Sequence, residues 1–234
     1  MSLSSFIILR RDCVRGEHVP RYNAFTRLLK YWIAVTILMF GGLSPAKAVD
    51  SIRLMVLGDS LTAGYGLPER DAFPSKLQAA LRLSGINAKV INAGVSGDTT
   101  AGALARISWA LSDKPTHVLV ELGANDALRG IDPRTTRRNL GAIVEKLQAA
   151  GVKVMLAGMY APPNWGKEYA VDFRRLYPDI AKKYGIGIYP FFLDGVAAER
   201  TLNQPDGIHP NEKGVTIIVK RILPSVRRLL GARE

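Results

Sequence analysis

The chain has 234 residues, and its 32 Lys and Arg against 20 Asp and Glu give a formal net charge of +12. Its single cysteine, Cys13, excludes a scaffold held by internal disulfides, so the fold must depend on its hydrophobic core. The basic residues near the C-terminus follow a helical pattern without interleaved aromatic side chains, which argues against nucleic-acid binding. These residues are Lys220, Arg221, Arg227, Arg228 and Arg233.

An uncharged and mostly apolar stretch, Tyr31 to Leu43, lies near the N-terminus, where basic side chains precede it and Ala46-Lys47-Ala48 follows it. This is the layout of a secretory signal. The whole uncharged segment between Lys30 and Lys47 is 16 residues long, shorter than the roughly 20 residues that span a bilayer. We therefore predict a leader over residues 1–48 that is cleaved after Ala48, one domain over residues 49–234, and a periplasmic or secreted protein.

Removal of residues 1–48 leaves 25 basic and 18 acidic residues, a net charge of +7. This excess is interpreted either as weak attraction to an anionic lipid surface or an acidic substrate, or simply as a solvated surface. The remaining 186 residues are enough to bury roughly 70% of the unfolded chain's surface without disulfides.

Short apolar runs alternate with longer segments of helical periodicity along this domain. The predicted strands are Ile52–Leu57, Ala88–Asn92, His117–Leu122, Val152–Ala157 and Gly187–Tyr189. The predicted helices are Phe73–Leu83, Thr99–Leu111, Pro133–Ala150, about Glu168–Tyr184, and a last helix that begins near Pro210 with a candidate break at Pro224. The alternation predicts an α/β domain of three layers with a five-stranded parallel sheet.

Polar loops follow the first three predicted strands and the long segment after the fifth. They are Gly58-Asp59-Ser60-Leu61, Asn92 to Asp98, Gly123-Ala124-Asn125-Asp126 and Asp206-Gly207-Ile208-His209-Pro210. Because ligands collect beyond the carboxyl ends of parallel strands, these loops are expected at one rim of the sheet. The loops Tyr160–Gly166 and Pro190–Pro205 are long enough to shape a binding cleft.

Ser60 is the candidate nucleophile at this rim, and a serine hydroxyl needs a neighbouring base to act in acyl transfer. The predicted domain contains two histidines, and His117 opens a strand at the opposite end of the sheet. His209 is therefore the candidate base. Asp206 lies three residues earlier, where its carboxylate can hydrogen-bond one imidazole nitrogen and leave the other for Ser60.

Three groups are candidates for an oxyanion hole, namely the backbone N–H of Ser60, the backbone N–H of Gly94 and the side-chain amide of Asn125. Ser96 is a rival nucleophile, because its surroundings resemble the G-x-S-x-G elbow, but Asp98 stands where that motif requires glycine. A neutral imidazole base predicts that kcat/KM rises with pH through about 6.5.

The same residues are also compatible with two other functions. The domain could be a binding module that keeps the cleft without catalysis, and Asp59 with Asp126 could hold Mg²⁺ on a substrate phosphate. Each motif alone is also interpreted as an ordinary turn or helix cap. Their joint placement on successive strand ends favours a serine hydrolase that uses no metal and no cofactor.

The four polar loops, taken in chain order, resemble the motifs of the SGNH (GDSL) hydrolases. The resemblance covers almost all of residues 52–230. Gly58-Asp59-Ser60-Leu61 matches the first block, Gly94 the second, Gly123-x-Asn125-Asp126 the third and Asp206-x-x-His209 the last. The longer strings GDSLTAGYGLP, NAGVSGDTTAG and LGANDALRG look like the bacterial exported group of thioesterase I, protease I and lysophospholipase, together with its arylesterase relatives.

The resemblance implies a flavodoxin-like sheet of order 2-1-3-4-5 and hydrolysis of aryl esters, acyl thioesters or lysophospholipids. It implies Ser60 as nucleophile, His209 as base and acid, Asp206 as orienting carboxylate and the three donors above as the oxyanion hole. Ala127 stands where thioesterase relatives often carry glycine. This difference is expected to affect the mobility of the loop and the preferred acyl-chain length.

Overall fold

The computed structural model describes Trp32 and residues 51–232. The predicted leader, residues 1–48, lies outside these described residues apart from Trp32. Within the described part of the chain, no helix combines the length and the apolar character that a bilayer crossing requires.

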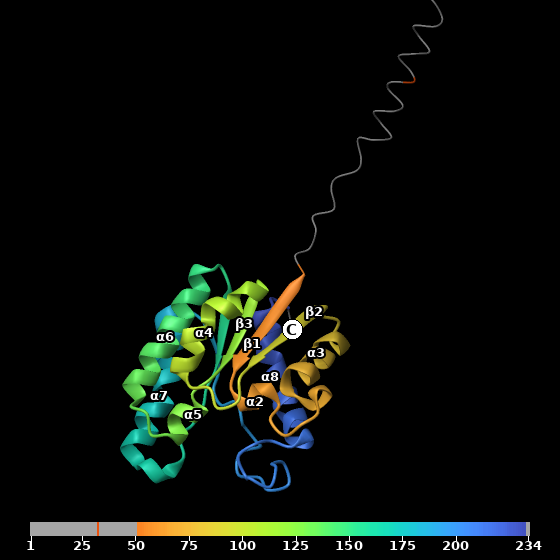
Figure 1. The fold of residues 1–234 in the computed structure, drawn as a ribbon. Helices are drawn as coiled ribbons and strands as arrows, with labels where there is room; N and C mark the ends of the chain where they lie inside the picture. Colours follow the sequence, from red (N-terminus) through yellow and green to blue (C-terminus); the bar gives the residue numbers. More distant parts are fainter. Residues whose placement is uncertain (1–31, 33–50, 233–234) are drawn as a thin grey trace, which may run out of the picture. The chain divides into compact units, whose positions relative to one another are not determined.

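Five parallel strands form a single sheet in the order β2-β1-β3-β4-β5 (Figure 1). They are β1 (Ile52–Gly58), β2 (Ala88–Gly94), β3 (His117–Glu121), β4 (Lys153–Ala157) and β5 (Gly187–Tyr189). All of β3 and most of β1 are buried, whereas the edge strands β2 and β5 are partly exposed. The continuous apolar runs of the central strands match their burial on both faces, and the predicted sheet order is confirmed.

Helices cover both faces of the sheet. They are α2 (Ser60–Ala63), α3 (Phe73–Leu83), α4 (Thr100–Ala110), α5 (Ala124–Leu128), α6 (Pro133–Ala149), α7 (Lys167–Tyr184) and α8 (Glu212–Leu229), and the short 3-10 helices are Glu69–Asp71, Leu111–Asp113 and Pro163–Trp165. Helix α3 packs against α8, and α6 packs against both α4 and α7 (Figure 1). Right-handed crossovers explain these two layers, because the chain steps outward from β1 to β2 and then reverses direction towards β3, β4 and β5.

The last helix differs from the prediction at both positions that involve proline. It begins at Glu212 rather than near Pro210, because the side chain of Asn211 accepts hydrogen bonds from two backbone N–H groups of the first turn. The predicted break at Pro224 is wrong, since α8 continues through it. Pro224 lies on the exposed side, where water can satisfy the carbonyl that proline leaves unbonded, and the buried face of the helix keeps its core contacts.

The strand order reverses between the two neighbours of β1, and this reversal opens a crevice at the carboxyl ends of β1 and β3. Two short helices that the sequence did not predict, α2 and α5, begin directly at these strand ends. Each helix turns the chain sharply after its strand, so the first polar side chains beyond β1 and β3 lie at the same rim.

Candidate active site

Ser60 is the first residue of α2, immediately beyond β1. Asp59 caps this helix, and its Oδ1 accepts a hydrogen bond of 3.0 Å from the backbone N–H of Leu61. A Cβ atom on Gly58 would lie 2.1 Å from Thr62 Oγ1, so the close approach of strand and helix requires glycine there. The turn that is capped in this way presents the hydroxyl of Ser60 to the cleft.

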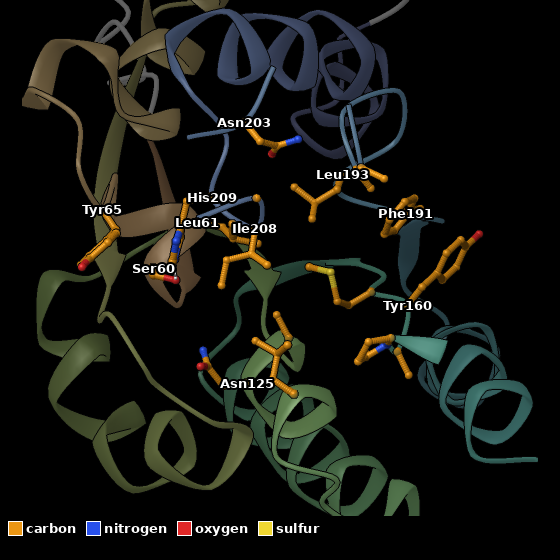
Figure 2. Close-up of a pocket in the computed structure, with 18 of the residues that line it drawn as sticks. Ser60, Leu61, Tyr65, Asn125, Tyr160, Phe191, Leu193, Asn203, Ile208 and His209 are labelled. Atoms are coloured by element: carbon orange, nitrogen blue, oxygen red, sulfur yellow. Dashed lines mark hydrogen bonds between the residues drawn. The ribbon is translucent and has the colours of Figure 1, made fainter. Parts of the chain in front are cut away.

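The structure brings the three predicted members of a catalytic triad together. Figure 2 shows two of them, Ser60 and His209, side by side at the cleft. His209 Nε2 lies 2.9 Å from Ser60 Oγ, and His209 Nδ1 lies 2.7 Å from Asp206 Oδ2. Because an ionised carboxylate can only accept, the proton resides on Nδ1, and Nε2 is the atom that accepts from the serine hydroxyl. The imidazole is therefore in the tautomer that a general base requires.

Asp206 is held as a carboxylate by donors from its own turn. Its Oδ1 accepts hydrogen bonds of 3.0 Å from the backbone N–H groups of both Ile208 and His209. The His209 N–H is the largest cause that lowers the pKa of Asp206 to about 2, and the imidazole adds a side-chain hydrogen bond in the same direction. Asp206 is thus ionised throughout the neutral range, and the exposure of 37% of its side chain to water also favours the charged form.

Gln204 and Tyr65 support His209, and sequence analysis missed both. The Gln204 backbone N–H donates to the carbonyl of His209 at 2.7 Å, and its Nε2 donates to the carbonyl of Tyr65 at 2.7 Å. The Tyr65 ring lies 4.7 Å from the imidazole ring. No sequence pattern indicated these contacts. In the structure Gly66 has a positive φ of 73°, and a Cβ there would lie 2.2 Å from Gln204 Oε1, so the close approach requires glycine.

Two of the predicted oxyanion donors already have partners in the structure. Asn125, in α5, donates from Nδ2 to Asp59 Oδ2 at 3.2 Å, and it lines the cleft. The backbone N–H of Gly94 donates to Asn92 Oδ1 at 3.0 Å. A side-chain amide has two donor hydrogens, so Asn125 retains one for a ligand. The roles of Ser60 N–H, Gly94 and Asn125 in an oxyanion hole remain predictions.

Two buried carboxyl groups lie beneath the nucleophile turn. Asp59 and Glu121 are both fully buried, and burial is the largest cause that raises the pKa of Asp59 to about 6 and that of Glu121 well above its ordinary value. Glu121 Oε2 accepts a 2.8 Å hydrogen bond from Thr62 Oγ1, while its Oε1 has no partner among the described residues. Glu121 ends an apolar strand, and no sequence pattern indicated its place under the site.

Asp126, which was considered as a metal ligand together with Asp59, connects α5 to two other helices. Its carboxylate accepts from the backbone N–H of Thr100 at 2.9 Å, from the Thr100 hydroxyl and from the Thr136 hydroxyl at 3.1 Å. Both aspartates therefore already accept hydrogen bonds from protein donors. In residues 51–232 and Trp32, no group of three or more His, Cys, Asp or Glu side chains is arranged to hold a metal ion.

Ser96 and His117 are not part of the hydrogen-bonded series Ser60–His209–Asp206. Ser96 lines the same cleft, but His209 Nε2 bonds to Ser60. His117 lies at the amino end of β3 and is 8% exposed, with Nδ1 2.8 Å from Thr116 Oγ1. Burial lowers the pKa of His117. The prediction that His117 lies away from the rim is confirmed.

An apolar cleft of about 600 Å³ extends away from Ser60 and His209 (Figure 2). The two loops that sequence analysis assigned to a cleft do line it, at Tyr160 to Pro163 and at positions between Phe191 and Asn203. Ala127 is 1% exposed in the core and does not line the cleft, whereas its neighbour Leu128 does. Ala127 therefore contributes to the packing of α5 and not to the cleft surface.

Comparisons with known proteins agree with this geometry. Residues 56–217 match the model of the GDSL-like Lipase/Acylhydrolase family. The chain is 40% identical over 177 residues to the arylesterase of Vibrio mimicus, covering 75% of this chain and 88% of that protein. It is 39% identical over 186 residues to thioesterase 1/protease 1/lysophospholipase L1 of Escherichia coli K12, covering 79% and 88%. The crystal structure of TesA matches with a TM-score of 0.73 at 39% identity, covering 76% of this chain and 99% of that one.

The chain therefore belongs to the GDSL-like lipase/acylhydrolase family, and its resemblance to the SGNH (GDSL) hydrolases is confirmed. Within that family it is a carboxylic ester hydrolase of the arylesterase, thioesterase I and lysophospholipase type.

Proposed function

We propose that this protein is an exported serine hydrolase that cleaves carboxylic esters and thioesters through an acyl-enzyme on Ser60. The observation that carries the proposal is the continuous hydrogen-bonded chain from Ser60 through His209 to Asp206, at one end of an apolar cleft. Relatives named as an arylesterase and as a thioesterase and lysophospholipase support aryl esters, acyl thioesters and lysophospholipids as substrates.

In the proposed first step, His209 Nε2 takes the proton of Ser60 as Oγ attacks the acyl carbonyl. Asp206 holds Nδ1–H in place and stabilises the imidazolium that forms. The imidazolium then donates its proton to the departing alcohol or thiol, which leaves the acyl group on Ser60. In the second step water gives a proton to His209 as its oxygen attacks the acyl carbon. The bond from this carbon to Ser60 Oγ then breaks, the imidazolium returns its proton to Oγ, and the carboxylic acid is released.

The negative charge that develops on the carbonyl oxygen needs fixed donors, and we assign this role to the backbone N–H groups of Ser60 and Gly94 and to the Asn125 amide. In the free protein Gly94 donates to the neutral amide oxygen of Asn92. An oxyanion is a stronger acceptor than a neutral amide oxygen, so it is able to compete for this N–H as the charge forms.

Export is proposed from the sequence layout alone, with cleavage after Ala48 and residence in the periplasm or outside the cell. The net charge of +7 that remains after residue 48 would favour weak contact with an anionic lipid surface. N-terminal sequencing of the protein from an extracytoplasmic fraction tests the cleavage site. The expected first residue is Val49, and a cytoplasmic protein that retains residues 1–48 would contradict export.

The catalytic assignment is tested by labelling the protein with a fluorophosphonate and mapping the adduct by mass spectrometry. We expect the adduct on Ser60 and a loss of about 10⁴-fold or more in kcat/KM for an aryl ester in Ser60→Ala. Ser96→Ala is the matched control and should label like the wild type.

Three outcomes of this experiment would contradict the proposal. An adduct on Ser96 would assign the nucleophile to the other serine. A protein that remains unlabelled and inactive towards esters would be a binding module. Activity that EDTA abolishes and Ser60→Ala retains would indicate a metal-dependent phosphohydrolase at Asp59 and Asp126.

A further inference from the structure

Tyr160 lies at the end of the cleft that is remote from Ser60 and His209 (Figure 2). Its ring stacks on Phe191, with ring centroids 4.1 Å apart and an angle of 7° between the planes. The guanidinium carbon of Arg174 lies 5.2 Å from the centroid of the same ring. Stacking and cation–π contacts of this kind hold the position of an aromatic side chain, and Tyr160 is held although it is 39% exposed.

A second groove of about 450 Å³ begins at the same tyrosine. Its lining combines apolar side chains, among them Val171 and Ile188, with Arg174 and Arg175 of α7. Tyr160 is the one lining residue that this groove shares with the catalytic cleft. Tyr160 therefore lies at the boundary between the two hollows.

We propose that Tyr160 sets the upper limit of acyl-chain length by closing the catalytic cleft at its remote end. The inference rests on the proposed function, since it assumes that the acyl chain of a substrate occupies this cleft. Each methylene that is buried against the apolar lining raises kcat/KM by up to about fourfold. Once the chain reaches the Tyr160 ring, a further methylene must enter water or displace a ring that is held by Phe191 and Arg174, so the gain stops.

The test measures kcat/KM for a series of p-nitrophenyl esters from butanoyl to tetradecanoyl, each below its critical micelle concentration. In Tyr160→Ala, which joins the two grooves, we expect the ratio of kcat/KM for tetradecanoyl to octanoyl ester to rise by about tenfold over the wild type. Tyr160→Trp, with a larger ring, should move the optimum to shorter chains. Tyr160→Phe keeps the stacked ring and should keep the wild-type ratio.

Trp165→Ala is the matched control, because Trp165 is an aromatic residue of the same segment, is 45% exposed and does not line the cleft. It should leave the whole ester profile unchanged. Thermal unfolding of each variant shows that the fold is retained.

If Tyr160→Ala and Tyr160→Trp both keep the wild-type ratio, or if Tyr160→Ala lowers kcat/KM for all chain lengths by one common factor, the inference is wrong. A wild-type protein that hydrolyses none of the esters would contradict the proposed function itself, so the two failures are distinguishable.

Discussion

Two aspartates of the proposed active site lie in opposite environments. Asp206 has a side chain that is 37% exposed and a pKa lowered to about 2, whereas Asp59 is fully buried with a pKa raised to about 6. Backbone N–H groups and an imidazole favour the charged form of Asp206. Loss of water around Asp59 outweighs the hydrogen bonds from Leu61 and Asn125.

The two carboxyl groups therefore have separate roles in the proposed site. Asp206 supplies a charge, which is needed when His209 becomes an imidazolium. Asp59 supplies geometry, because its two oxygens fix the helix start at Leu61 and the amide of Asn125. A substitution that removes the charge but keeps the shape should therefore lower activity strongly at Asp206. At Asp59 the same kind of substitution should change how the free energy of unfolding depends on pH.

Asp206→Asn should produce the largest effect. The amide cannot stabilise an imidazolium and favours the wrong tautomer of His209, so we expect kcat/KM for an aryl ester at pH 7 to fall by about 10³- to 10⁴-fold. Steady-state kinetics measure the loss, and chemical denaturation should show a far smaller change than the kinetic one. A decrease of less than about tenfold would show that Asp206 does not act on the base.

Asn125→Ala tests the group that Asp59 positions. Loss of one oxyanion donor should lower kcat by about 10²- to 10³-fold with little change in KM. Asn164→Ala is the matched control, since Asn164 is exposed and does not line the cleft. If Asn125→Ala raised KM and left kcat unchanged, the amide would bind the substrate in its ground state rather than the oxyanion.

Asp59→Asn should have its clearest effect on stability as a function of pH. A carboxyl whose pKa is higher in the folded protein than the ordinary 3.8 stabilises the fold at low pH, and this stabilisation is lost as the pH rises from about 4 to about 6. The wild type should therefore lose about 3 kcal/mol of its free energy of unfolding across this window through Asp59. In Asp59→Asn the side chain at position 59 does not titrate, so this part of the free energy of unfolding should stay constant across the window.

Urea denaturation at pH 4 and pH 7 measures this difference between the wild type and Asp59→Asn. Asp172→Asn, at an exposed position, is the control and should follow the wild type at both values. Parallel curves for the wild type and Asp59→Asn would mean that Asp59 is ionised in the folded protein as readily as in the unfolded chain.

Much of the site could be predicted because its chemistry is carried by scarce residue types at strand ends. With only two histidines in the predicted domain, the position of His117 at the start of a strand left His209 as the base. The spacing of Asp206 and His209 placed their side chains on one turn. The strands follow from short apolar runs that are visible in the local sequence, so their predicted ends lie close to the observed ones.

Predictions failed where a local signal competes with packing. The prolines near the start and within the last helix suggested a beginning at Pro210 and a break at Pro224, but the cap at Asn211 and the buried face of α8 decide both positions. Likewise, α2 and α5 are too short to show a helical period.

The α/β alternation, the rim and the candidate residues Ser60, His209 and Asp206 could be predicted from the sequence, because each depends on residue type and on spacing along the chain. The tertiary structure was needed to show which imidazole nitrogen faces Ser60, that Asp59 and Glu121 are buried, and that Tyr160 lines two grooves. These features depend on contacts between segments that are far apart in sequence, and no local pattern of residues records such contacts.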